Sequence, residues 1–332
     1  DGKMTAFCGR AIRLLLGAFA LGAMVSGRAQ VVEKFPTKPV RLVVAFPVAG
    51  ATDILARQFA LKLSEQFGYQ VIVDNRPGAG GTIGSKIVSA AIPDGYTLTM
   101  GTTSTHAIGP HLYTQKPYDP MADFTAITAM ASSPTVLMVA AQVPAKSVKE
   151  FVALAKAQPG KINFGSSGIG TQFHLSGELL KLLGGINMVH VPYKGTALVY
   201  PDMISGQIQM LFDVPPAALP FIKQGRVRAL GVSGAKRTPV LADVPTIAEA
   251  GIAAFDADLW WGLFAPPKMA KDRLARVHAE SVKALTSTEV KDRYANMGTD
   301  VVANSPEAFL AFLRADNAKW EKVVKASGAR AD

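Results

Sequence analysis

Apolar and polar residues alternate along the chain in two patterns, one typical of buried strands and one typical of amphipathic helices. Residues 40–46 form a continuous apolar run, as expected of a strand that is buried on both faces. Residues 52–67 follow, with apolar positions at helical spacing. The predicted helical stripe consists of Ile54, Leu55, Phe59, Leu61 and Leu63. The same succession of strand and helix then continues along the chain.

The remaining segments predict an α/β fold. Strands are predicted at 70–75, 96–102, 135–141, 162–164, 188–193, 207–213, 227–234 and 258–267. Helices are predicted at 78–91, 147–160, 172–184, 271–286 and 306–327. Strands that alternate with helices in this way are typical of largely parallel sheets.

Two strand–loop–helix units, residues 45–55 and 163–175, have similar patterns. If the chain crosses between domains near residues 138 and 261, each domain contains one of these units. We therefore expect two α/β lobes with a cleft between them. The first would comprise residues 36–137 together with 262–332, and the second residues 138–261. Ligand sites in open α/β sheets lie beyond the carboxyl ends of the strands, where both loops would be.

The first 29 residues have the pattern of a secretory signal peptide. Lys3, Arg10 and Arg13 form a positive region, and residues 14–25 are apolar. This apolar segment is shorter than the about 20 residues that a membrane-spanning helix needs. Small residues before position 30 favour cleavage after Ala29. The alternative is a retained membrane anchor.

The composition excludes several classes of function. Hydrophobic residues make up 49% of the 332 residues, enough for a sizeable core. Cys8 is the only cysteine, so the chain after residue 29 has no disulfide and no thiolate chemistry. Residues 1–29 carry four of the 35 basic residues and one of the 25 acidic ones, which leaves a dispersed net charge of +7. Without a basic run interleaved with aromatics we expect no nucleic-acid binding, while a mild positive charge suits small anions.

The two loops have the composition of anion-binding sites. In residues 164–174, FGSSGIGTQFH, glycines and serines precede a predicted helix. A helix start leaves four backbone N–H groups unpaired and carries a partial positive charge, and glycines let the backbone approach a ligand closely. Two such loops facing each other would hold one carboxylate or phosphate between the lobes. The alternative is that Ser166, Ser167, Thr171 and Thr52 merely cap helices.

Known catalytic and nucleotide-binding motifs do not fit the loops. Neither Ser166 nor Ser167 has the two flanking glycines that the G-x-S-x-G motif of serine hydrolases requires. Residues 78–84 have Ile83 where a dinucleotide-binding motif has its last glycine. The histidines form no zinc-binding motif. We therefore expect no catalytic residue, no metal and no cofactor.

Three further polar residues are candidates for the predicted cleft. Asp53 either stabilises a helix N-terminus or faces a ligand. Asp213 ends the predicted strand 207–213 and would project into the cleft, in a structural or a ligand-binding role. His106 either lines the cleft or is a structural histidine.

Several motifs occur in the order that is typical of one family. They are FPTKPVRLVVAFPVAGATD at 35–53, VIVDNRPGAGGTIGSKIVSAAIPDGYTL at 71–98, NFGSSGIGTQFHLSGELL at 163–180, VHVPYKG at 189–195, ISGQIQMLFD at 204–213 and VPTIAEAG at 244–251. Through them the chain after residue 29 resembles the extracytoplasmic solute receptors of tripartite tricarboxylate transporters, also called the Bug family.

The resemblance implies a periplasmic binding protein of the type II-like, two-lobed class, with two Rossmann-like domains joined by a two-strand hinge. It implies no catalytic activity. The expected ligand is a small carboxylate: a di- or tricarboxylate, an amino acid or an aromatic acid. The expected partners are the large and small membrane subunits of a transporter, and the receptor is expected to be a monomer.

In the family, the ligand carboxylate is held between the two Gly-rich loops. The resemblance assigns Phe46, Ala49, Gly50, Ala51, Thr52 and Asp53 to the first loop, and Ser166, Ser167, Gly170, Thr171 and His174 to the second. It places Tyr193, Lys194, Gly195 and Asp213 at the far end of the ligand, where His106 and Tyr200 are also expected to act on specificity. The chain departs from the family at Ala49, where glycine is common, and at Tyr200, which follows the YKG motif.

Two alternatives of other kinds accompany this interpretation. A secreted hydrolase on a related two-lobed scaffold would need an activated nucleophile or a metal. A receptor that signals to a membrane sensor would share the same fold and the same site.

Overall fold

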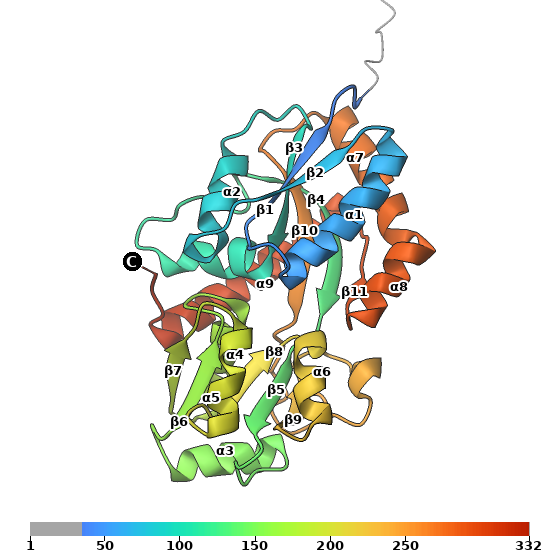
Figure 1. The fold of residues 1–332 in the computed structure, drawn as a ribbon. Coiled ribbons are helices and arrows are strands. Elements are labelled where there is room, and N and C mark those ends of the chain that lie inside the picture. The colour runs from blue at the N-terminus through green and yellow to red at the C-terminus, as the bar shows by residue number, and fades with distance from the viewer. Residues whose placement is uncertain (1–34, 332) are drawn as a thin grey trace, which may run out of the picture. The chain divides into compact units, whose positions relative to one another are not determined.

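The computed structural model describes residues 35–331, and the predicted signal peptide at 1–29 lies outside them. Within residues 36–331 the strands form two separate sheets, one above the other in Figure 1. The predicted α/β fold with two lobes is therefore confirmed. No helix in the described part of the chain is long and apolar enough to cross a bilayer.

The first sheet has the strand order β11-β4-β10-β3-β1-β2. Its strands are β1 (Val40–Val44), β2 (Val71–Asn75), β3 (Thr97–Thr102), β4 (Thr125–Ser133), β10 (Leu259–Ala265) and β11 (Asp300–Val301). Strand β1 pairs in parallel with β2 and β3, whereas β10 runs antiparallel to β3 and β4. The sheet is therefore mixed, and the expectation of a largely parallel sheet holds only for β1, β2 and β3.

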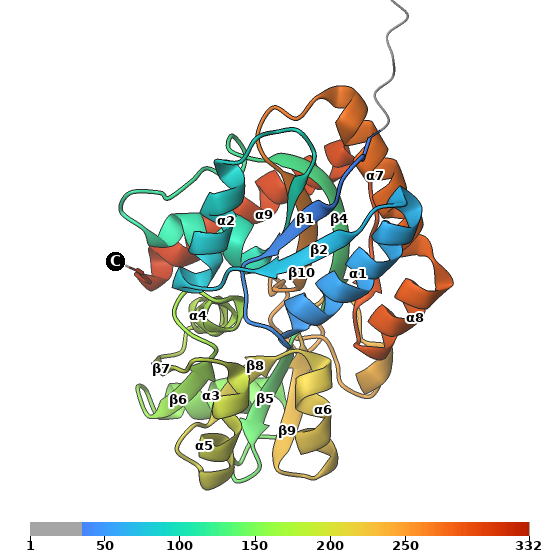
Figure 2. The same cartoon turned by 45° about the horizontal axis from the view of Figure 1, so that its top comes forward.

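Helices cover both faces of the first sheet. They are α1 (Ala51–Phe67), α2 (Thr82–Ser89), α7 (Lys271–Thr286), α8 (Thr288–Asn296) and α9 (Pro306–Ser327). Helices α2 and α9 lie on one side of the sheet, and α1, α7 and α8 lie on the other (Figure 2). Short turns η1 (Ala79–Gly81), η2 (Ser104–Ile108) and η3 (Gly109–Leu112) follow β2 and β3.

The second sheet has the order β7-β6-β8-β5-β9. Its strands are β5 (Val136–Ala140), β6 (Ile162–Ser166), β7 (Met188–Pro192), β8 (Met210–Asp213) and β9 (Val227–Val232). Its helices are α3 (Val148–Ala157), α4 (Gln172–Gly184), α5 (Tyr200–Ser205) and α6 (Pro215–Lys223), with short turns η4 (Thr196–Leu198) and η5 (Pro239–Leu241). Strand β6 is parallel to β7 and β8, while β5 is antiparallel to β8 and β9.

The chain passes between the sheets twice, at positions that lie side by side. It leaves the first sheet after Ser133 and enters the second at Val136, and it returns between Val232 and Leu259. Thr135 and Ser233 join the two crossings, because each backbone N–H is bonded to an oxygen of the other residue. The predicted domain limits, 137/138 and 261/262, fall within β5 and β10, and the division into domains stays a proposal.

Both Gly-rich loops follow the carboxyl ends of parallel strands. Strand β1 leads through residues 45–50 into α1, and β6 leads through residues 167–171 into α4. Helix α1 packs through Leu55, Phe59 and Leu63, which are fully buried. Ile54 and Leu61, which the sequence pattern placed in the same stripe, are 40% and 57% exposed, because a helix with one packed face leaves its flanks in solvent.

Candidate functional site

The first loop, residues 45–50, is held in place by the carboxylate of Asp53. Its Oδ2 accepts hydrogen bonds from the Ala49 N–H (2.9 Å) and from Arg57 Nε (3.0 Å). Its Oδ1 accepts a hydrogen bond from Asn75 Nδ2 (2.9 Å), which also donates to the Phe46 carbonyl oxygen (3.0 Å). The loop is therefore tied to α1 and to the end of β2 at the same time.

The ionised form of Asp53 is favoured despite its burial. Desolvation raises the pKa of this carboxyl, but the hydrogen bonds from Arg57, the Ala49 amide and Asn75 outweigh it and bring the pKa below its ordinary value. These three donors occupy the carboxylate. Of the two roles that the sequence left open for Asp53, the contacts support the structural one.

The start of α1 presents backbone N–H groups with no partner. Its N-cap is Gly50, which has no side chain to accept a hydrogen bond. No acceptor is found among residues 35–331 for the N–H groups of Ala51 and Thr52. The Thr52 hydroxyl accepts a hydrogen bond from Trp261 Nε1 (2.9 Å) instead of capping the helix. The first loop therefore ends in an uncapped helix start.

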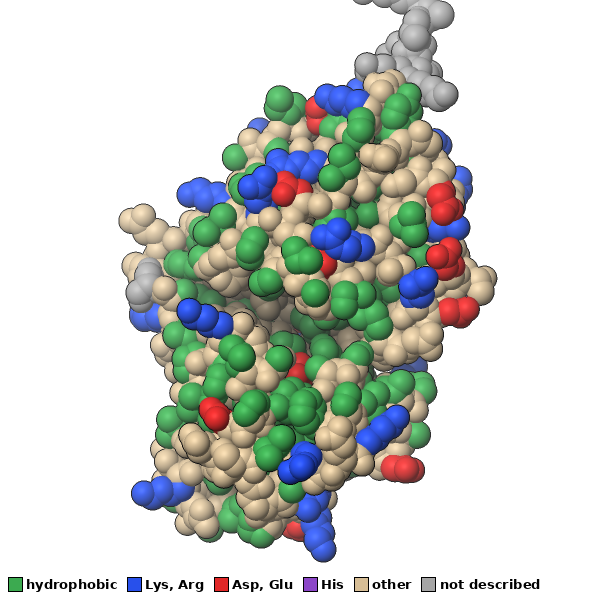
Figure 3. Space-filling model, in the orientation of Figure 1, with side chains coloured by type: hydrophobic (Ala, Val, Ile, Leu, Met, Phe, Trp, Pro, Cys, Tyr) green, Lys and Arg blue, Asp and Glu red, His purple; other side chains and the backbone are tan. Residues whose placement is uncertain are grey.

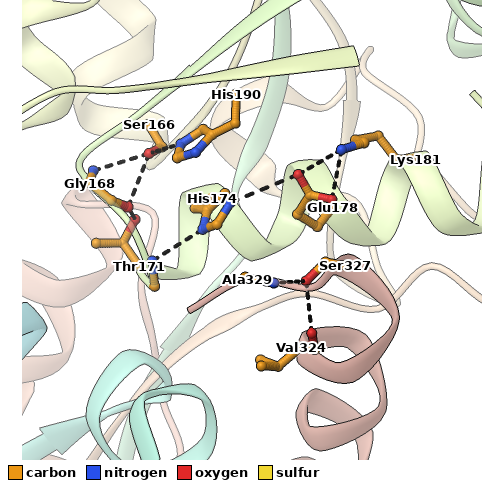
Figure 4. Close-up of polar contacts among 11 residues, drawn as sticks. Ser166, Gly168, Thr171, His174, Glu178, Lys181, His190, Val324, Ser327 and Ala329 are labelled. Atoms are coloured by element: carbon orange, nitrogen blue, oxygen red, sulfur yellow. Dashed lines mark hydrogen bonds and ion pairs between the residues drawn. The ribbon is translucent and has the colours of Figure 1, made fainter. Parts of the chain in front are cut away.

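The second loop, residues 167–171, is organised by hydroxyl groups that bond back onto the loop itself (Figure 4). Ser166 Oγ accepts the Gly168 N–H (3.0 Å) and lies 2.7 Å from His190 Nε2. Thr171 Oγ1 donates to the Gly168 carbonyl oxygen (2.8 Å). The Ser167 hydroxyl has no partner within residues 35–331. One of the two adjacent serines is thus structural, and the other is free.

Two stacked imidazoles lie under the second loop. The rings of His174 and His190 are 3.8 Å apart and nearly parallel, with an angle of 16°. The Gly170 N–H donates to His174 Nδ1 (3.1 Å), so this nitrogen carries no proton and the neutral ring holds its hydrogen on Nε2. His174 Nε2 faces Glu178 at 3.8 Å, and Glu178 also pairs with Lys181, as Figure 4 shows.

Burial keeps both rings neutral. Desolvation lowers the pKa of His174 to about 3 and that of His190 to about 4, and the positive charge of Lys181 acts in the same direction. A protonated His174 would lose the hydrogen bond from Gly170. His174, which the resemblance placed among ligand-binding residues, therefore acts on the shape of the loop.

The start of α4 resembles that of α1. Thr171 is the N-cap, but its side chain does not cap the helix. The Gln172 N–H donates to Ser104 Oγ of η2 (3.1 Å), a contact between the lobes, while the Phe173 N–H finds no acceptor in the described chain. Elsewhere, Ser147, Ser287 and Ser305 do cap α3, α8 and α9. The capping role considered for Thr52, Ser166, Ser167 and Thr171 is thus absent at both loops.

Helix α6 also starts at the carboxyl end of a strand, but it offers fewer amides. Pro215 and Pro216 occupy its first two positions and have no N–H. The preceding amide, of Val214, donates to Asp213 Oδ1 (2.8 Å). The starts of α1 and α4 each combine a strand end, an uncapped helix and a glycine-containing loop. The start of α2 has the same features, with Gly81 as its N-cap, but there the Thr82 N–H donates to the Ala79 carbonyl oxygen.

The residues expected at the far end of a ligand are mostly occupied with each other. Asp213 Oδ2 accepts the Tyr200 hydroxyl (2.9 Å), and Asp213 is buried. Burial raises the pKa of Asp213 to about 6, although the Val214 amide and the Tyr200 hydroxyl oppose this shift. The Tyr193 hydroxyl donates to Asp202 (2.5 Å). Desolvation and Asp202 raise the pKa of Tyr193 to about 12.

Three other candidate residues occupy different environments. Lys194 is exposed, and Gly195 beside it has a positive φ of 144°. His106 is fully buried in the first lobe, where its ring stacks on Phe264 with centroids 4.0 Å apart. The expectation that His106 lines the cleft does not fit this position, because aromatic rings enclose the imidazole.

The contact between Ser166 and His190 pairs the residue types that serine hydrolases use as nucleophile and base. Ser166 is fully buried and holds the Gly168 amide. A nucleophile must be reached by a substrate, and its base needs a pKa nearer to neutrality than about 4. The pair is therefore a structural one, and no group of three or more potential metal ligands is found in the described residues.

Sequence reasoning missed the residues that reach the loops from other elements. Asn75 at the end of β2, His190 on β7 and Ser104 on η2 contact the loops across strands or across lobes. Asn75 stands in the DN pair that precedes RPG, and this position was the available signal for it.

The space-filling view in Figure 3 shows the surface hollowed between the two lobes, with hydrophobic side chains on its walls.

This chain is similar to known proteins in sequence and in structure. Residues 55–329 match the model of the tripartite tricarboxylate transporter family receptor. Protein BugT of Bordetella pertussis is 31% identical over 299 residues, which cover 90% of this chain and 92% of BugT.

Solved structures are also similar to this chain. Rpa4515 of R. palustris, solved with adipate, is 35% identical, with a TM-score of 0.80 and coverage of 89% of this chain and 99% of that one. MatC from Rhodopseudomonas palustris, with bound malate, is 31% identical, with a TM-score of 0.78 and coverage of 87% and 100%.

Proposed function

We propose that this protein, which belongs to the family of tripartite tricarboxylate transporter receptors of the Bug type, captures a small carboxylate in the periplasm. The two lobes would close on the ligand by a hinge motion at the paired crossings, and the loaded receptor would deliver it to the large and small membrane subunits of a transporter. The predicted signal peptide would export the protein, which would act as a monomer.

The observation that carries this proposal is the pair of uncapped helix starts, one in each lobe. The N–H groups of Ala51, Thr52 and Phe173 are unpaired donors, and they lie at the positive dipole ends of α1 and α4. A carboxylate accepts such donors in charge-assisted hydrogen bonds, which are about twice as strong as neutral ones. The free Ser167 hydroxyl would add one more donor. The adipate and malate bound by two relatives support a carboxylate as ligand.

The proposed site separates residues that bind from residues that support. Ala51, Thr52 and Ser167 would contact the carboxylate through backbone or hydroxyl groups, whereas Gly50 and Thr171 donate within their own loops. Asp53, Ser166, Gly170 and His174 would hold the two loops in shape, and Phe46 and Ala49 belong to the supported part of the first loop. Tyr193, Lys194 and Gly195 lie along the second lobe beyond its loop, and His106 is left out of the proposed set.

The substitution Ala51→Pro tests the site without breaking the helix. Proline at the first helical position lacks only the N–H that is unpaired here, and Gly50, with φ −74° and ψ 164°, suits the residue before a proline. Losing a hydrogen bond to a charged group costs roughly 1.5–3 kcal/mol, so the affinity should fall about 10- to 100-fold.

A thermal-shift screen of mono-, di- and tricarboxylates first identifies a ligand, and calorimetry then compares the variants. Lys271→Pro is the matched control, since Lys271 begins α7 after Ala270, which also has extended backbone angles. This control should bind like the unaltered protein. Unchanged affinity in Ala51→Pro would refute the proposed site, and no stabilisation by any carboxylate would refute the proposed ligand class.

A further inference from the structure

A cavity of about 370 Å³ lies next to the second loop and outside the set of residues expected to control specificity. Four segments enclose it: the turn before α2, the turn η3, the tip of the second loop and the residues after α9. Its lining consists of Ala79, Gly80, Thr82, Gly109, Leu112, Tyr113, Ile169, Gly170, Arg330 and Ala331. Its size suits a small organic molecule or the distal half of one.

The lining has the chemistry of a subsite for an acidic group. Leu112 and Ile169 supply apolar walls, the hydroxyls of Thr82 and Tyr113 supply polar groups, and Arg330 supplies a cation. No carboxylate side chain lines this cavity, and Arg330 forms no ion pair with another residue in the range 35–331. A guanidinium with unused donors pairs with a carboxylate in a planar, two-pronged geometry.

The backbone beside the cavity is fixed. The Ala331 N–H donates to the Leu112 carbonyl oxygen (3.0 Å), and the Ala329 N–H donates to Ser327 Oγ (3.2 Å). Figure 4 shows Ser327 and Ala329 beside the first turns of α4, which α9 contacts. Arg330 is therefore held at the cavity wall by its neighbours on both sides, while its exposed side chain can still reorient.

The second loop connects this cavity to the proposed carboxylate site. Gly170, with φ 76°, lines the cavity and belongs to the loop, and a Cβ there would collide with Leu112 Cδ1. Glycine therefore lets the loop approach η3 and close one wall of the cavity. A ligand held by one end at the start of α4 would have its other end directed along this wall.

We propose that the cavity holds the distal end of the ligand and that Arg330 pairs with a second acidic group there. This inference rests on the proposed carboxylate site. It makes Arg330 a specificity-determining residue that favours carboxylates with a second acidic group over monocarboxylates of the same length. It also moves the control of specificity away from Tyr200 and Asp213, whose polar groups already bond to each other.

Calorimetry with matched acids tests the proposal. Succinate is compared with butanoate, and adipate with hexanoate, for the unaltered protein, for Arg330→Gln and for Lys322→Gln. Lys322 is an exposed cation on α9 outside the cavity lining, so its substitution makes the same change in net charge. The unaltered protein should bind the diacid of a pair at least about tenfold more tightly than the monoacid.

The two variants should differ in their affinity for the diacids. Arg330→Gln should weaken the diacid about tenfold and change the monoacid less than about twofold, and Lys322→Gln should change neither. Equal effects of Arg330→Gln on both acids, or no effect on either, would overturn the inference. If the acids bind but Ala51→Pro leaves their affinity unchanged, the proposed carboxylate site fails, whatever Arg330→Gln does.

A second variant changes the size of the cavity without touching its charge. Ile169 lines the cavity, is 49% exposed and tolerates a larger side chain. Ile169→Phe should narrow the cavity and shift the preferred diacid to a shorter chain in the series from succinate to adipate. The same order of affinities in both proteins would place the distal end of the ligand elsewhere and overturn the inference.

Discussion

The two loops present the same kind of helix start but are supported by different chemistry. An ionised carboxylate, Asp53, orders the first loop through a guanidinium, an amide side chain and a backbone N–H. Two neutral imidazoles and two hydroxyls order the second loop. In both loops the titratable side chains face inward, and the free donors are backbone N–H groups together with the hydroxyl of Ser167. Residues that stand out in a motif can therefore be the supports of a site rather than its contacts.

The largest expected effect comes from removing the support of the first loop. Asp53→Ala removes the acceptor of the Ala49 N–H, one of the two acceptors of Asn75 Nδ2, and the partner of Arg57, which is half exposed. Because a hydrogen bond to a charged group contributes roughly 1.5–3 kcal/mol and these donors are partly solvent-exposed, the free energy of unfolding should fall by about 2 kcal/mol. Ligand affinity should fall as well, since the start of α1 would no longer be fixed. Urea unfolding and calorimetry measure the two effects.

Asp272→Ala is the matched control for this substitution. Asp272 also lies in the first turn of a helix, α7, but it is exposed. Its removal should change the free energy of unfolding by less than about 0.5 kcal/mol. A similar change in both variants would mean that Asp53 acts only through the helix dipole.

Between pH 6.5 and 4, the contribution of His190 in the second loop to the free energy of unfolding should depend on pH, whereas that of Asp53 in the first loop should not. The folded state lowers the pKa of His190 to about 4, so between pH 6.5 and 4 the unfolded chain binds more protons. The contribution of His190 to the free energy of unfolding therefore falls as the pH drops through this range. The lowered pKa of Asp53 contributes stability that is lost only below its ordinary value of 3.8.

His190→Leu should flatten this dependence. The difference between the variant and the unaltered protein should change by roughly 0.5–1 kcal/mol per pH unit between pH 6.5 and 5. His174, whose pKa falls to about 3, acts in the same range, while Asp213 and Asp258, with pKa values raised to about 6, act in the opposite direction. All three remain in both proteins. Parallel curves from urea unfolding at pH 7, 6 and 5 would contradict a neutral His190.

Two adjacent serines allow support and contact to be compared within one loop. Ser166→Ala removes the partner of the Gly168 N–H and of His190, so the free energy of unfolding should fall by about 1 kcal/mol. Ser167→Ala should leave stability unchanged and weaken ligand binding about fivefold, because its free hydroxyl would donate to the carboxylate. The reverse assignment of the two effects would exchange the proposed roles of Ser166 and Ser167.

The fold and the position of the loops could be predicted from the sequence because both depend on local patterns. Periodicity located β1, α1, β6 and α4, and the rule on strand ends placed both loops at the same edge of their sheets. The antiparallel strands β5 and β10 were not predicted as such, because strand direction depends on how distant segments pair.

The supports of the loops could not be predicted, because they come from residues far away in the sequence. His190 reaches Ser166 from a neighbouring strand 24 residues later, and Asn75 reaches Asp53 from 22 residues later. The cavity beside Gly170 joins four segments that no local pattern connects. Burial of His106 likewise follows from the packing of Phe124 and Phe264 around it, and not from the polar sequence GTTSTHA in which it stands.

The smallest effect is expected at the one position where the first loop departs from its family. Ala49 has φ 66°, where a Cβ costs about 1–2 kcal/mol, while glycine loses roughly 0.5–1 kcal/mol in backbone entropy. Ala49→Gly should therefore stabilise the protein by about 0.5 kcal/mol in urea unfolding. Gly170→Ala, the reverse substitution in the second loop, should destabilise the protein, because the new Cβ would collide with Leu112. Affinity should not change in Ala49→Gly, since the Ala49 N–H is bonded to Asp53. A clear gain in affinity in Ala49→Gly would contradict this assignment. It would mean that the amide of residue 49 contacts the ligand and that alanine at this position weakens binding.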